Sequence, residues 1–350
     1  MPSVWDWVDR FYYTTDDEGL GLYRKFLDGM DQLDHDPDLA IAILNQVRQM
    51  AKEKGLDWWV QLATHWELQA LLHYKQDYSN VIEIAAQAAV EVRKPQYTEL
   101  PQRVCLHEDL ISAYCGRDPL GYKDIIQGAI DYMQSQVKPG IDCYLCLQSL
   151  RIDFLMLMEK YDEAKRINLE FLEASQGEDY HLGSAYRLLC QIAYVQEDWT
   201  SLENWATLGI QTAQKTRSSS APAQLAEVQM WRALYEQKTG DKDQAVTLYK
   251  QAVMTAESYP PGVYDGYYDA AAAFFELGNQ LDQALTLRET QYTKVSKESR
   301  YYMEIRCLLE IIRLKHSLSL PKDELIQQAE AVIRKLKDPT PILKRLDTYR

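Results

Sequence analysis

The sequence predicts an all-α fold of stacked helical hairpins, and three observations support this prediction. The first is a repeat with a nearly constant period. Polar turns that lead into a second apolar segment recur at Ala40, Val81, Tyr122, Ala164, Leu202, Ala245, Ala284 and Leu325. These anchor residues are separated by 41, 41, 42, 38, 43, 39 and 41 positions. A fixed period of this size indicates stacked units, each of which packs only against its neighbours.

The second and third observations are helical periodicity within each repeat and breakers between repeats. Apolar side chains recur at helical spacing in two segments per repeat, as in the run Ile41, Leu44, Val47 and Ala51. Clusters rich in Gly and Pro, such as Pro139-Gly140 and Pro260-Pro261-Gly262, separate the repeats. The sequence lacks long β-branched alternation and Asn-Gly turns, so no strands are expected. Together these patterns predict about eight antiparallel hairpins.

The hairpins resemble the tetratricopeptide repeat family. Gly240-Asp241 followed by Ala245, Tyr249 and Ala252 matches the second half of that repeat, with a polar turn and then small, aromatic and small residues. The turns 76–81, 160–164 and 196–199 are similar to it. The period here averages about 41 residues, whereas the family's standard unit has about 34. Each hairpin therefore has longer helices or loops than the standard repeat.

The resemblance implies a right-handed α-solenoid and a single superhelix over residues 1–350. In this interpretation residues 1–22 form an N-terminal cap, residues 23–338 form the hairpins, and residues 339–350 form a C-terminal tail or cap. Long-helix relatives of the family include scaffold proteins and bacterial regulators that sense peptides. The resemblance therefore implies a binding function.

Composition and charge exclude several classes of function. The chain has 350 residues, of which 46% are hydrophobic, and this is ample for a large buried core. Its formal net charge of −14 argues against nucleic-acid binding, which needs a basic face. We see no secretory signal and no apolar run long enough to insert in a membrane. The six cysteines are interpreted as reduced thiols of a cytoplasmic protein.

Catalytic signatures are missing from the sequence. It contains no phosphate-binding loop, no complete dinucleotide fingerprint, no His-Glu-x-x-His and no Gly-x-Ser-x-Gly. We therefore expect a protein that is not an enzyme and holds no cofactor. An enzyme with an unrecognised site among the first helices remains an alternative.

Two patterns suggest metal binding, and we expect neither to bind a metal. Cys105, His107, Cys143 and Cys146 would converge at the starts of two successive first helices, where they offer four possible zinc ligands. Packed thiols are the simpler interpretation, because free Cys is commonly buried. The segment 34–38 imitates the start of a calcium loop but lacks the required Gly and Glu. We predict instead that Asp36 caps a helix that begins at Pro37.

The resemblance also implies candidate binding residues. In the tetratricopeptide repeat family, the first helix of each hairpin lines the concave face. The chain is also rich in amphipathic aromatic residues, with 24 Tyr and 8 Trp against 6 Phe, and such side chains are common binding hot spots. In that register the inward residues are Trp66, His73, His107, Tyr114, Asp153, Arg187, Gln191, Tyr194, Met230, Gln237, Asp269 and Glu276.

The first hypothesis is a non-enzymatic scaffold or adaptor that binds a protein or peptide in this concave groove. The carboxylates around the groove would select a partner with some basic character. The alternative is a peptide-responsive regulator that acts through another protein and whose superhelix tightens when ligand binds.

Overall fold

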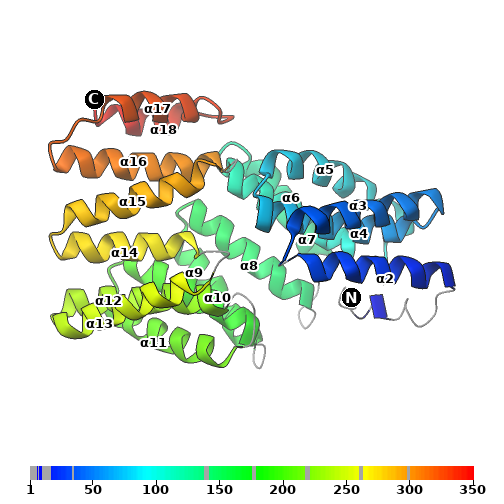
Figure 1. The fold of residues 1–350 in the computed structure, drawn as a ribbon, viewed down its shortest axis with the longest axis horizontal. Coiled ribbons are helices and arrows are strands. Elements are labelled where there is room, and N and C mark those ends of the chain that lie inside the picture. The colour runs from blue at the N-terminus through cyan, green and yellow to red at the C-terminus, as the bar shows by residue number, and fades with distance from the viewer. Residues whose placement is uncertain are drawn as a thin grey trace. The chain divides into compact units, whose positions relative to one another are not determined.

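The computed structural model describes residues 6, 8, 9, 17–33, 35–137, 142–175, 179–216, 221–259, 263–297 and 300–350. Within them it contains seventeen α-helices and no strand, which confirms the all-α prediction (Figure 1). The first helices are α2 (Asp17–Gln32), α3 (Pro37–Glu53), α4 (Asp57–Ala70), α5 (Tyr78–Glu91), α6 (Gln102–Arg117), α7 (Lys123–Gln136) and α8 (Asp142–Leu157). A π-helical segment, Leu71–Lys75, extends α4, and a short 3-10 helix, Pro95–Tyr97, precedes α6.

The remaining helices follow the same alternation of helix and short turn. They are α9 (Tyr161–Ala174), α10 (Asp179–Val195), α11 (Trp199–Lys215), α12 (Ala221–Thr239), α13 (Lys242–Glu257), α14 (Asp265–Leu277), α15 (Leu281–Val295), α16 (Tyr301–Ser317), α17 (Asp323–Ile333) and α18 (Thr340–Asp347). The last of these lies in the segment expected to be a tail or cap. The breaker pairs Pro139-Gly140 and Pro260-Pro261-Gly262 lie outside the described residues.

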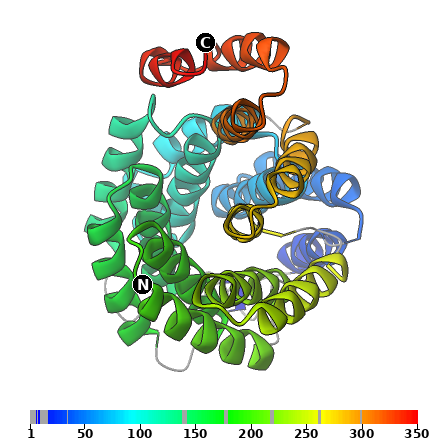
Figure 2. The same cartoon turned by 90° about the vertical axis from the view of Figure 1, so that its left-hand side faces the viewer.

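The chain divides into two compact units. Unit 1 comprises residues 1–150 and 298–302, and unit 2 comprises residues 151–297 and 303–350. In unit 1 consecutive helices pack from α2 to α7, and α4 also contacts α6. In unit 2 consecutive helices pack from α9 to α13 and α14 packs on α15, while α12 contacts both α10 and α14 (Figure 2). In each unit, therefore, some even-numbered helices contact one another as well as their odd-numbered neighbours.

The anchor residues of the repeat mark every second helix. Ala40, Val81, Ala164, Leu202, Ala245 and Ala284 lie near the starts of α3, α5, α9, α11, α13 and α15, and all are fully buried. Tyr122 is the residue before α7, and Leu325 lies in the first turn of α17. A small or apolar residue at this position lets the second helix of each hairpin approach its neighbours closely.

Most turns after the even-numbered helices contain a residue with positive φ, although Asp118 after α6 does not. Such residues follow α10 at Glu197, with φ 55°, and α12 at Gly240, with φ 114°. Equivalent residues with positive φ are Gln76, Glu159, Asn279 and Ser319. A left-handed residue just past the last turn is a common way to end a helix. Most of the polar turns that the sequence indicates are therefore helix ends with a residue of positive φ.

Aspartates begin several of the helices that follow these turns. The side chains of Asp77, Asp198 and Asp241 accept hydrogen bonds from the backbone N–H three residues later, at distances of 3.0–3.3 Å. Asp36 caps α3 in the same way through the Leu39 N–H, with Pro37 at the first helical position. The predicted cap is confirmed, whereas Asp34, the first residue of the calcium-like segment, lies outside the described residues.

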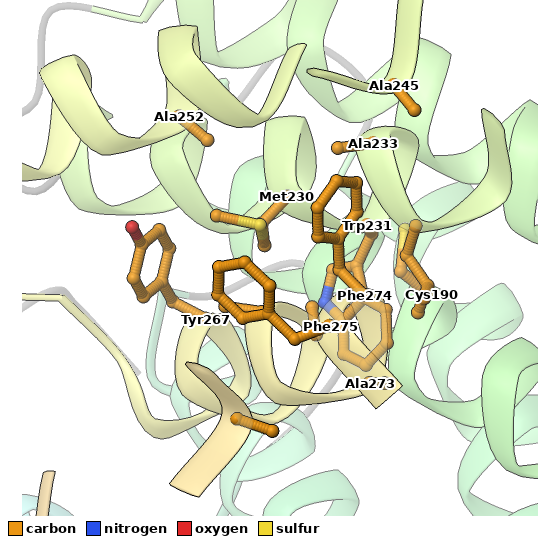
Figure 3. Packing of buried hydrophobic residues seen from close by; sticks show 14 of the residues in the cluster. Cys190, Met230, Trp231, Ala233, Ala245, Ala252, Tyr267, Ala273, Phe274 and Phe275 are labelled. Atoms are coloured by element: carbon orange, nitrogen blue, oxygen red, sulfur yellow. The ribbon is translucent and has the colours of Figure 1, made fainter. Parts of the chain in front are cut away.

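The core of unit 2 is built from apolar side chains of α10 to α16. Met230 and Trp231 of α12 lie beside Tyr267, Phe274 and Phe275 of α14 (Figure 3). The core of unit 1 gathers around the buried Trp59, whose ring contacts Phe26 and Tyr23. Among the described residues, no helix is long and apolar enough to cross a membrane.

The helix caps give a first prediction. Asp241→Ala removes the acceptor of the Gln244 N–H, and we expect the free energy of unfolding to fall by about 1 kcal/mol. Asp241→Asn should retain most of the stability, because asparagine caps equally well. Urea unfolding of the three proteins measures the difference. Equal losses in both variants would mean that the charge of Asp241 matters and its cap does not.

Candidate functional site

The twelve predicted inward residues all lie on even-numbered helices or on the π-helical segment after α4. Their exposure differs, however. His107 and Met230 are fully buried, and Tyr114 and Gln237 nearly so. His73 is exposed. The half-buried side chains are those of Trp66, Asp153, Arg187, Gln191, Tyr194, Asp269 and Glu276.

Side chains on successive even-numbered helices meet at sequence separations close to the repeat period. Gln191 bonds Glu227 across 36 residues, Gln69 bonds Asp109 across 40, and Arg306 bonds Asp269 across 37. The period thus determines which polar groups become neighbours. Two clusters of such groups result, one in each unit.

The cluster of unit 2 centres on Arg187 of α10 and Glu227 of α12. Glu227 is fully buried, and its Oε1 accepts hydrogen bonds from Gln191 Nε2 at 2.8 Å and Trp231 Nε1 at 3.2 Å. Its Oε2 lies 3.6 Å from Arg187 Nη1, which is a loose ion pair. Burial raises the pKa of Glu227, and the attraction of Arg187 only partly offsets this effect.

Arg187 interacts with an aromatic ring and with several carboxylates. Its guanidinium lies over the ring of Tyr264, with Cζ 4.5 Å from the centroid. Besides Glu227, the charges of Asp153 and Asp265 act on it. One guanidinium therefore faces three carboxylates. Asp265 also receives a long hydrogen bond of 3.4 Å from Gln291.

Asp153 of α8 is the least satisfied of the three carboxylates. Within the described part of the chain it forms no hydrogen bond and no ion pair shorter than 4 Å, and only the more distant charge of Arg187 acts on it. Burial raises the pKa of Asp153. A half-buried carboxylate in this position is electrostatically suited to a positively charged ligand group.

The other two predicted carboxylates of unit 2 are compensated within the fold. Asp269 lies 2.7 Å from Arg288 and 3.3 Å from Arg306. Glu276 lies 2.7 Å from Arg313 of α16. These residues therefore link α14 to α15 and α16, and their charges are neutralised by arginines of the same chain. Sequence reasoning predicted Asp269 and Glu276 but missed these cationic partners.

The cluster of unit 1 joins α4, α6 and the start of α8. His65 Nδ1 lies 2.8 Å from Asp109 Oδ2, and Gln69 Nε2 donates to Asp109 Oδ1 at 2.6 Å. The carboxylate thus holds a proton on Nδ1 and leaves Nε2 as an acceptor. Burial lowers the pKa of His65, but the charges of Asp109, Glu108 and Cys143 outweigh it and raise the value overall.

Glu108 lies beside this pair on α6 and was not among the predicted residues. Its half-buried carboxyl forms no hydrogen bond or ion pair with the residues that the structure describes. Burial raises its pKa to about 7, the charge of Asp109 adds to the shift, and His65 opposes it. The sequence carries no signal for this property, because the pKa depends on burial that only the packed helices create.

The four candidate zinc ligands do not all converge. The thiol of Cys105 is hydrogen-bonded to Cys143, and Cys146 lies near enough for its charge to act on Cys105. His107 lies apart, because its Nδ1 donates to the carbonyl of Arg103 and its Nε2 accepts from Arg93. Burial lowers the pKa of His107 to about 4. Across the described residues, no three His, Cys, Asp or Glu side chains are arranged to hold a metal ion.

The chain matches no protein-family model and no curated protein.

Gly266, at the start of α14, allows a prediction about the unit 2 cluster. A Cβ at this position would overlap Glu227 Oε1 and Gln191 Nε2, so Gly266→Ala must displace their hydrogen bond. We expect a loss of about 1–3 kcal/mol of unfolding free energy. Gly128→Ala in α7, where a Cβ meets no atom within 4 Å, should instead gain about 0.5–1 kcal/mol. Thermal and urea unfolding measure the stability of both variants. If the two substitutions changed the unfolding free energy equally, Glu227 and Gln191 would not lie close to Gly266.

The raised pKa of Glu108 gives a pH-dependent prediction. Because about 7 lies above the ordinary value of 4.5, the folded chain holds this proton more tightly than the unfolded chain. The resulting stability is complete below pH 4.5 and is lost as the pH rises through 7. Glu108→Gln removes this loss. The free energy of unfolding of the variant should therefore exceed that of the wild type by on the order of 2 kcal/mol at pH 8.

The comparison of the two proteins must be made at both ends of this range. At pH 4.5 the Glu108→Gln difference should shrink, because Glu108 is then protonated in the folded chain. His107 acts in the opposite direction, since its lowered pKa removes stability as the pH falls from 6.5 toward 4, but it does so equally in both proteins. If the difference in unfolding free energy between the two proteins did not depend on pH, the pKa of Glu108 would not be raised in the folded chain.

Proposed function

We propose that this chain is a tetratricopeptide-like helical-repeat protein that binds a protein or peptide segment of basic character. In this proposal the repeat forms a right-handed solenoid of about eight hairpins, and the protein acts as a scaffold or adaptor without catalysis. The alternation of helices and the contacts among even-numbered helices support the proposed architecture. We place the binding face on α8, α10, α12 and α14 of unit 2.

The observation that carries the proposal is the half-buried carboxylate of Asp153, on which only the charge of Arg187 acts. Three carboxylates face this one guanidinium, and Asp153 has no hydrogen-bond partner among the described side chains. An arginine or lysine side chain of a partner would supply the missing positive charge. A charge-assisted hydrogen bond to a half-buried carboxylate is stronger than one in water, because the surroundings screen it less.

The neighbouring groups suit a peptide. Tyr264 presents a ring that already stacks on Arg187, and Tyr194 of α10 is half-buried near Asp269 and Glu276. Aromatic rings of this kind bury the apolar stem of a long basic side chain. Gln191 supplies an amide near the same cluster, although its Nε2 is engaged by Glu227.

Selection from a random peptide library tests the proposal, because it imposes no particular ligand sequence. Displayed 12-residue peptides are selected on the immobilised full chain, and the enriched peptides should contain arginine or lysine. Affinity is then measured by fluorescence anisotropy for one enriched peptide and for its copy with glutamine at each basic position. We expect the glutamine copy to bind at least about tenfold more weakly, which corresponds to the loss of about 1.4 kcal/mol.

Asp153→Asn is the matched variant of the protein. It removes the charge, keeps the shape, and should weaken binding of the basic peptide by about tenfold, which is typical of a lost charge-assisted contact. Asp243→Asn is the control, because Asp243 is exposed at the start of α13. Circular dichroism checks that both variants are folded. Failure to enrich basic peptides, or equal affinity in wild type and Asp153→Asn, would contradict the proposal.

A further inference from the structure

The thiols of unit 1 form a second cluster that the peptide-binding proposal does not use. Cys105 lies in the first turn of α6, and Cys143 is the second residue of α8. Both are buried, and the two thiols share a hydrogen bond. They lie 38 residues apart in sequence, close to the repeat period, so the helix stacking itself brings the two sulfur atoms together.

The two sulfur atoms differ in character. The hydrogen bond to Cys143 and its own burial raise the pKa of Cys105 well above its ordinary value, so Cys105 stays a thiol and can donate its proton. Cys143 is then the acceptor of this hydrogen bond. A hydrogen bond from a neighbouring thiol stabilises a thiolate.

A base, His65, lies near enough to Cys143 for the two groups to interact electrostatically. Asp109 holds the proton of His65 on Nδ1 at 2.8 Å, so Nε2 is free to accept another proton. The charge of Cys143 acts on the His65 ring. The imidazolium formed when His65 accepts the thiol proton would stay paired with the fully buried Asp109. The imidazole therefore interacts with both the Asp109 carboxylate and the charge of Cys143, and this combination of groups can activate a cysteine.

We propose that Cys105 and Cys143 form a reversible disulfide when the protein meets hydrogen peroxide, with Cys143 as the reacting sulfur and Cys105 as the resolving thiol. The oxidant must be small, since each cysteine exposes only 6% of its surface. His65 takes the proton of the Cys143 thiol. The thiolate attacks one peroxide oxygen and the O–O bond breaks. The departing hydroxide takes the proton that His65 accepted and leaves as water.

The second step closes the disulfide. Cys143 is now a sulfenic acid, and the sulfur of Cys105 attacks the Cys143 sulfur. The S–OH bond breaks, and the hydroxide leaves as a second water with the proton of Cys105. Two thiols and one peroxide therefore give one disulfide and two waters. The product covalently links α6 to α8 and closes a loop between positions 105 and 143.

Peptide mapping of the full chain tests the proposal. The reduced protein is treated with a small excess of hydrogen peroxide at pH 7, free thiols are blocked with iodoacetamide, and the digest is analysed by mass spectrometry without reduction. We expect two of the six thiols to be lost and one cross-linked peptide pair to contain Cys105 and Cys143. Dithiothreitol should restore both thiols. Six remaining thiols, or a cross-link between Cys143 and Cys146 instead, would overturn the proposal.

Variants separate the roles of the three residues. Cys105→Ser should stop the cross-link and leave Cys143 as a trapped sulfenic acid, detectable with dimedone. Cys190→Ser is the matched control, because Cys190 is a buried thiol in the core of unit 2 and should not affect the reaction. His65→Gln should slow oxidation at least tenfold at pH 7 and much less at pH 9, where hydroxide can remove the thiol proton. An equal effect at both pH values would refute the role of His65 as base.

Discussion

The structure depends on one constraint: a single helical hairpin cannot bury its apolar face alone, so each hairpin must pack against the next. Small anchor residues make this packing close. Ala164, Ala245 and Ala284 are fully buried at the starts of second helices, where a larger side chain would push the neighbouring helices apart. The left-handed turns and aspartate caps end one helix and begin the next, so the repeat maintains its period without strands or disulfides among the described residues.

The period also determines which chemical groups meet. A residue on one even-numbered helix faces a residue about 40 positions later on the next, as Gln69 faces Asp109 and Arg187 faces Glu227. Polar pairs of this kind link neighbouring hairpins, and the thiol pair of Cys105 and Cys143 obeys the same rule. The polar and thiol clusters of both units are therefore consequences of the stacking.

Sequence reasoning predicted the helices, their turns and the helix cap at Asp36 because these depend on local patterns. It also placed all twelve candidates on even-numbered helices or the π-helical segment that extends α4. It could not predict that His107 and Met230 are fully buried, because a shift of one residue along a long helix turns a side chain by about 100°. Glu227 could have been found from its separation of 40 residues from Arg187. Glu108 could not, because its property arises from burial alone.

The contrast between two parts of unit 2 favours a binding role for Asp153. The fold can compensate a carboxylate on an even-numbered helix with an arginine on a neighbouring helix, as Arg306 does for Asp269 and Arg313 does for Glu276. Around Arg187 the same geometry leaves Asp153 without such a partner among the described residues. An uncompensated half-buried carboxylate lowers stability, and one further basic residue would remove that cost. We therefore interpret Asp153 as a group whose partner comes from outside the fold.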